Sequence, residues 1–125
     1  METVYLAGPF ENIEFEVAVN LHRKAAAWLV EKGYSVFSPL MNAVPVWLET
    51  KEKVSEPWWE ALEERFIKAV DVLVVITVPE TIISAGCQRE IKMSQRAKKP
   101  IGLLVVTDKG FELHFNQLKE PKDAD

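Results

Sequence analysis

The chain has 125 residues, of which 48% are hydrophobic and 27% charged, so it can form one domain with its own core. A formal net charge of −4 argues against binding to polymeric nucleic acid, which requires a basic face. The single cysteine, Cys87, excludes a disulfide within the chain. We find no apolar run of membrane-spanning length and no signal-peptide pattern, so we expect a cytoplasmic protein without membrane contact.

The first half of the chain predicts a strand, a long helix and a second strand. Residues 3–7 are apolar strand formers, and the breaker pair Gly8-Pro9 follows them. An apolar repeat at every fourth position then predicts a helix that ends before Gly33. Its stripe consists of Ile13, Val17, Leu21, Ala25 and Leu29, and Ala18 and Trp28 widen it. Residues 34–37 predict a second strand ending at Ser38, and residues 40–54 predict a short helix or an ordered loop.

The second half predicts two more helices and two more strands. Ser55 and Pro57 open a helix whose apolar face is Trp59, Leu62, Phe66 and Val70. Residues 72–78 are the most apolar run and predict a central strand that is buried on both faces. A third helix should begin at Ser84 and run to about Lys98, followed by a strand at residues 100–106. The tail beyond is mixed in character, and residues 119–125 are expected to be frayed.

This alternation of strands and helices predicts a single α/β domain over residues 1–118. The expected architecture is doubly wound and flavodoxin-like, with a mostly parallel sheet of four to five strands and helices on both faces. Right-handed crossovers place a ligand crevice at the carboxyl ends of the strands. Three segments should meet there: residues 8–10 (Gly8, Pro9 and Phe10), Ser38, and residues 81–90.

The last of these segments carries the most chemistry. Ser84 and Gly86 lie at a predicted helix start, where free N–H groups favour an anion. Glu90 lies one turn further along the same face, and its side chain would lean back toward that start. We expect the helix dipole to keep Glu90 ionised, as suits a nucleophile. The alternative is that Ser84 only caps the helix and that Glu90 is solvated beside Arg89.

Four segments in this order resemble the nucleoside 2-deoxyribosyltransferase superfamily, which includes the nucleoside 5′-monophosphate N-glycosidases. They are YLAGP at 5–9, AVD at 69–71, the pattern SxGxxxE that ends at Glu90, and KPI at 99–101. The resemblance extends from about residue 3 to residue 118. It implies an enzyme that cleaves or transfers the N-glycosidic bond of a (deoxy)nucleoside or its monophosphate, without a metal or organic cofactor.

The resemblance also implies roles for individual residues. Glu90 would attack the anomeric carbon of the sugar and form a glycosyl-enzyme. Ser84 would hold the 5′ group of the substrate, and residues 8–10 would line the sugar and base pocket. Glu63, eight residues before Asp71, replaces an aspartate that positions or protonates the departing base, and its reach is longer by one methylene.

Two further implications concern the assembly. Asn116 would match an asparagine that some family members contribute to a neighbouring subunit's pocket, although an ordinary tail asparagine is the alternative. We expect a homo-oligomer of two or more copies. The partner is expected to be a small nucleoside or nucleotide.

Several residues have a second interpretation. Glu63 is equally compatible with a solvated position on a charged helix, and the two histidines, His22 and His114, lack metal-ligand spacing. His22 should be solvated. Asp71 should be structural, and Cys87, where many family members carry threonine, should be a buried structural thiol.

The substitutions at positions 63 and 87 leave a second hypothesis open: a nucleotide-binding or sensing module on the same fold, without turnover. A phospho-receiver-like domain is disfavoured, because residues 7–9 read Ala-Gly-Pro where receivers carry acidic residues.

Overall fold

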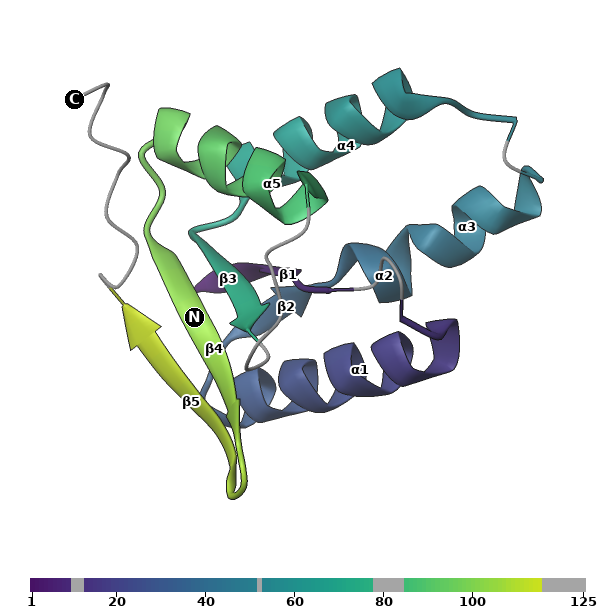
Figure 1. Cartoon of the computed structure of the whole chain (residues 1–125). Coiled ribbons are helices and arrows are strands. Elements are labelled where there is room, and N and C mark those ends of the chain that lie inside the picture. Colours follow the sequence, from purple (N-terminus) through teal and green to yellow (C-terminus); the bar gives the residue numbers. More distant parts are fainter. Residues whose placement is uncertain (10–12, 52, 78–84, 116–125) are drawn as a thin grey trace.

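The computed structural model describes residues 1–9, 13–51, 53–77 and 85–115 (Figure 1). Its centre is a five-stranded sheet with the strand order β2-β1-β3-β4-β5. The strands are β1 (Thr3–Ala7), β2 (Ser35–Phe37), β3 (Val72–Thr77), β4 (Ile101–Thr107) and β5 (Gly110–Phe115). The first four are parallel, and β5 pairs antiparallel with β4 at the edge. This confirms the predicted doubly wound, mostly parallel α/β fold, and β5 is a strand that the sequence patterns did not identify.

In the described part of the chain, five helices connect the strands. They are α1 (Phe15–Glu31), α2 (Pro39–Asn42), α3 (Val44–Glu49), α4 (Glu56–Ala69) and α5 (Ala85–Arg96). Gly33 has φ +98° just beyond α1, a conformation that favours glycine at a helix end. Ser55 occupies the N-cap position of α4 and Pro57 its first turn, as predicted, but the Ser55 side chain makes no capping hydrogen bond. Among the described residues, no helix is long and apolar enough to span a membrane.

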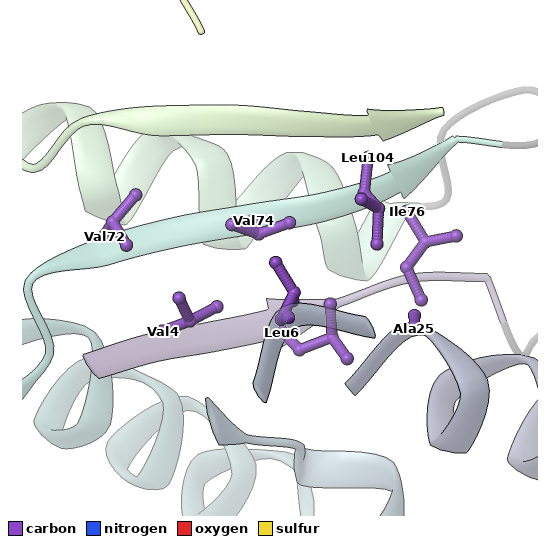
Figure 2. Close-up of a cluster of buried hydrophobic side chains, with 8 residues drawn as sticks. Val4, Leu6, Ala25, Val72, Val74, Ile76 and Leu104 are labelled. Carbon is purple, nitrogen blue, oxygen red and sulfur yellow. The ribbon is translucent and has the colours of Figure 1, made fainter. Parts of the chain in front are cut away.

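The two faces of the sheet are covered by different helices (Figure 1). On one face, α1 packs on an aliphatic cluster from β1, β3 and β4, part of which Figure 2 shows. Its buried members are Val4, Leu6, Ala25, Leu29, Val72, Val74, Ile76 and Leu104. The central strand β3 is therefore covered from this side, as its unbroken apolar run predicts.

On the other face, α4 and α5 pack on the alternate residues of the same strands. The buried members of this cluster are Tyr5, Ala7, Ile67, Val70, Leu73, Val75, Cys87 and Ile91. Because side chains alternate along a strand, β1 sends Val4 and Leu6 toward α1 but Tyr5 and Ala7 toward α4 and α5. The tyrosine is thereby fixed beneath the two helices.

The predicted faces of two helices were partly wrong. In α1, Val17 is 54% exposed, and the buried residues are Ala18, His22, Ala25 and Leu29. A strict four-residue repeat drifts away from the true period of 3.6 residues, which the spacing of the buried residues follows. In α4, Phe66 is 37% exposed, although its ring stacks on Phe37 at a centroid distance of 4.0 Å.

Candidate active site

Glu90 lies on the inner side of α5, and only 7% of it is exposed. The hydroxyl of Tyr5, which is fully buried at the centre of β1, donates a hydrogen bond of 2.5 Å to its Oε2. The solvated glutamate that we considered as an alternative is therefore excluded. A buried carboxyl group with a dedicated donor is the type of group that enzymes use for chemistry.

Glu63 lies opposite Glu90, on α4, and is 6% exposed. The interpretation of Glu63 as a surface residue is therefore wrong: sequence neighbours that are charged do not define the face of a helix. The guanidinium of Arg89, called the Arg89 fork below, forms a bidentate pair with the Glu63 carboxylate. Its Nε donates a hydrogen bond of 2.9 Å to Oε1, and its Nη2 donates one of 3.2 Å to Oε2. The third nitrogen, Nη1, lies 3.0 Å from Oε1 of Glu56.

Burial of the two carboxyl groups controls their protonation. It raises the pKa of Glu90 to about 8, the nearby charge of Glu63 raises it as well, and the hydrogen bond from Tyr5 opposes the shift. Burial also raises the pKa of Glu63, while Arg89 opposes that shift. The expectation that Glu90 stays ionised was wrong, because desolvation of the buried carboxyl group raises its pKa.

The two carboxyl groups also form a hydrogen bond with each other, which raises the pKa of Glu90 and lowers that of Glu63. Such a bond requires a proton on one of the two partners. Burial raises the pKa of Tyr5, so its hydroxyl stays protonated and remains a donor. The site thus carries one ionised carboxylate, one protonated carboxyl group and one phenol.

The turn after β1 is fixed by a second buried group. A Cβ added to Gly8 would lie 2.8 Å from Nε2 of His22 and 2.9 Å from Cδ1 of Ile76, so a larger residue would displace one of these side chains. Burial lowers the pKa of His22 to about 4, so its ring is neutral, and Nε2 lies 3.3 Å from the carbonyl oxygen of Pro9. The prediction that His22 is solvated was wrong, and its ring instead supports the Gly8-Pro9 turn.

Other predicted site residues have structural partners or lie elsewhere. Ser38 is buried at the end of β2, where its hydroxyl accepts a hydrogen bond of 3.4 Å from the backbone of Met41 and caps α2. Gly86 lies in the first turn of α5. Phe10, Ser84 and Asn116 lie outside the described residues, as does the predicted frayed tail.

Asp71 and Cys87 were expected to have structural roles, and the contacts of Asp71 and the burial of Cys87 agree with this expectation. Asp71 accepts a hydrogen bond of 2.7 Å from the backbone of Thr3 and so ties the start of β1 to β3. Cys87 is buried in the cluster beneath α4 and α5. In the described part of the chain, no group of three or more His, Cys, Asp or Glu side chains is arranged to hold a metal ion.

The sequence analysis missed two members of the site. Tyr5 was placed in a strand and in the YLAGP segment but was given no role in the site, although a tyrosine in a fully buried strand requires a partner for its hydroxyl. Arg89 was considered only as a solvated neighbour of Glu90. No pattern in the sequence indicates that its guanidinium reaches across to α4, because that contact joins residues 26 positions apart.

Comparison with known proteins places the chain in a family and a fold. Residues 2–105 match the model of the family described as a domain of unknown function (DUF1937). A search of the curated proteins gives no match.

Solved structures give three informative neighbours. A 2-deoxyribosyltransferase from Bacillus psychrosaccharolyticus is 27% identical, with a TM-score of 0.59 over 85% of this chain and 74% of that one. A CMP N-glycosidase from Clostridium botulinum is 23% identical, with a TM-score of 0.56 over 83% and 71%. A 2-deoxyribosyltransferase from Leishmania mexicana is 14% identical, with a TM-score of 0.60 over 86% and 66%. The resemblance to the nucleoside 2-deoxyribosyltransferase superfamily is thus confirmed, and the chain belongs to the DUF1937 family.

Proposed function

We propose that this protein cleaves or transfers the N-glycosidic bond of a (deoxy)nucleoside or a nucleoside 5′-monophosphate, with Glu90 as the nucleophile. The observation that carries this proposal is the buried Glu90 carboxyl group, which Tyr5 orients and which hydrogen-bonds to the Glu63 carboxyl group. A pair of carboxyl groups suffices to break a glycosidic bond, because one attacks while the other supplies a proton. The 2-deoxyribosyltransferase and CMP N-glycosidase neighbours support the same class of reaction.

The reaction can be written with the groups present. Ionised Glu90 attacks the anomeric carbon, the bond from that carbon to the base nitrogen breaks, and the base leaves with a proton from Glu63. The product is an ester between the sugar and Glu90. A water molecule or a second base then attacks the same carbon and gives its proton to Glu63, and the bond to Glu90 breaks. The pair again holds one proton.

Tyr5 serves this sequence as an orienting donor. Its hydroxyl holds Oε2 of Glu90 in place, and its bond favours the ionised form that attacks. The proton must lie on Glu63 when the base departs, whereas in the free protein the two hydrogen bonds from Arg89 favour ionised Glu63 and so favour Glu90 as the carrier. A proton transfer between the two carboxyl groups therefore precedes the attack.

The preferred substrate and the assembly remain predictions. Because Gly86 lies in the first turn of α5, the free N–H groups of that turn can contact an anion. We therefore propose a preference for the 5′-monophosphate over the nucleoside.

We also propose that the protein forms a homo-oligomer. Light scattering coupled to size-exclusion chromatography measures its molar mass directly.

The test is release of free base from a panel of nucleosides and 5′-monophosphates, followed by chromatography. The wild-type protein should release base from at least one member, and Glu90→Gln should lower that rate by about 10³-fold or more. Glu64→Gln, an exposed change on the neighbouring helix, is the matched control and should keep the full rate. Glu90→Ala should still bind the substrate.

Two results would contradict the proposal. A Glu90→Gln variant with the wild-type rate would remove Glu90 as nucleophile. Binding of a nucleotide by the wild type without release of base from any member would instead support the nucleotide-binding module considered above.

A further inference from the structure

Five polar side chains form a continuous series from the surface to the centre of the sheet. Glu56 at the start of α4 is 62% exposed, and Arg89 of α5 is 32% exposed. Glu63 and Glu90 are buried, and Tyr5 at the inner end is fully buried. Each member contacts the next through an ion pair or a hydrogen bond. Among the described residues, this series connects the protein surface to the buried pair of carboxyl groups.

The two buried carboxyl groups have unequal partners. Glu63 accepts two hydrogen bonds from the Arg89 fork, whose Nη2 also lies 2.8 Å from Oε1. Glu90 accepts from the neutral phenol of Tyr5, and within the described residues no cation forms an ion pair with it. Charge-assisted bonds from a guanidinium stabilise a carboxylate more than a bond from a phenol does.

We propose that Arg89 is a positioning residue that decides which of the two carboxyl groups carries their shared proton. While the fork grips Glu63, that group is ionised and the proton stays on Glu90. When the fork opens, the proton moves to Glu63, which becomes the acid, and Glu90 becomes the nucleophile. The catalytic consequence rests on the proposed function, whereas the placement of the proton does not.

The remaining groups that face the pair do not offset this effect. Glu56, from the same helix as Glu63, is exposed, and an exposed ion pair with Arg89 contributes little. Tyr5 from β1 is neutral, and Cys87 from α5 lies in the apolar cluster. Arg89 is thus the one cation among the described residues that lies within ion-pair distance of either buried carboxyl group.

The experiment is a pH titration of ¹³C-carboxyl-labelled glutamate in the intact protein by NMR, which needs no substrate. Glu63→Gln and Glu90→Gln spectra assign the two signals. In the wild type near neutral pH, the Glu63 signal should be that of an ionised group and the Glu90 signal that of a protonated one. In Arg89→Met, the Glu63 midpoint should rise by about one to three pH units, and the proton should move toward Glu63.

Two further variants complete the design. Lys68→Met removes an exposed cation from α4 that pairs with Glu64, and it should leave both midpoints unchanged. Arg89→Lys keeps the charge but loses the planar fork, so it should shift the Glu63 midpoint upward by a smaller amount. If circular dichroism shows that Arg89→Met does not fold, the Glu63 midpoint of Arg89→Lys provides the test instead.

A folded Arg89→Met or Arg89→Lys protein whose Glu63 midpoint equals that of the wild type would overturn the proposal. A wild type with the proton on Glu63 at neutral pH would overturn it as well. The outcome is independent of turnover: the titration can succeed in a protein that releases no base, and that result would contradict only the proposed function.

Discussion

The two faces of the sheet use the same strands for different purposes. Toward α1, the strands present an aliphatic cluster, and the one buried titratable side chain of that helix is His22, at its contact with Gly8. Toward α4 and α5, the buried set includes Tyr5, Glu63 and Glu90. Neighbouring residues of β1 point alternately to the aliphatic cluster on one face and to the buried polar groups on the other. The difference between the two faces therefore comes from the alternation of side chains along the strand. One face provides the apolar burial that stabilises the fold, and the other holds the groups that can react.

This division has an energetic consequence. Burial of aliphatic side chains stabilises the protein in proportion to the area removed from water. Burial of carboxyl groups destabilises it unless they are protonated or paired. Substitutions on the two faces should therefore change stability in opposite directions.

The largest expected effect is on the face toward α1. Leu29 is fully buried in the aliphatic cluster, so Leu29→Ala should lower the free energy of unfolding by about 2–5 kcal/mol. Val30→Ala, on the exposed side of the same helix, should change it by about 0.5 kcal/mol or less. Urea unfolding measures both. Equal losses for the two variants would show that this face does not carry the core.

The next effect is on the opposite face and depends on pH. The pKa of Glu90 is raised to about 8, so the folded protein holds its proton over a range in which the unfolded chain has lost it. Wild-type stability therefore falls as the pH rises from the unfolded pKa to the folded one. Glu90→Gln cannot ionise, and its gain over the wild type should grow by about 1–4 kcal/mol between about pH 5 and about pH 9.

Thermal unfolding at several pH values measures this gain, with Glu64→Gln as the exposed control that should show no such growth. A constant difference between Glu90→Gln and the wild type across this range would mean that Glu90 titrates normally.

The smallest effect concerns the phenol. Tyr5→Phe removes the hydrogen bond that lowers the pKa of Glu90, so the Glu90 midpoint should rise above its wild-type value, by about one unit or less. The carboxyl titration described above measures it. Tyr34→Phe, a tyrosine packed against the cluster on the α1 face, is the control and should leave the midpoint unchanged. An unchanged midpoint in Tyr5→Phe would mean that this hydroxyl does not act on Glu90.

Much of the fold could be predicted because its signals are local. The apolar run of residues 72–77 predicts a strand that is buried on both faces, and the breaker at Gly8 marks the end of β1. The edge strand β5 was missed because its burial is only partial, and its sequence resembles a surface segment. Helix position was predicted well, but the faces of α1 and α4 were not.

The site was harder to predict for a physical reason. A buried carboxyl group such as Glu63 has the same sequence signature as an exposed one, since only its partner across the structure distinguishes them. Glu90 was found through the family pattern and the spacing from Gly86. The Tyr5 and Arg89 contacts join elements far apart in the chain, and no periodicity encodes them. The raised pKa of Glu90 follows from burial, which is a property of the folded state.

The central claim is that Glu90 becomes covalently attached to the sugar. Mixing the wild-type protein with a substrate that releases base, quenching with acid and mapping peptides by mass spectrometry tests this directly. We predict that the peptide containing Glu90 gains the mass of the sugar, and that Glu90→Gln yields no such adduct. Release of base with the sugar attached to another residue, or with no adduct at any quench time, would contradict the account.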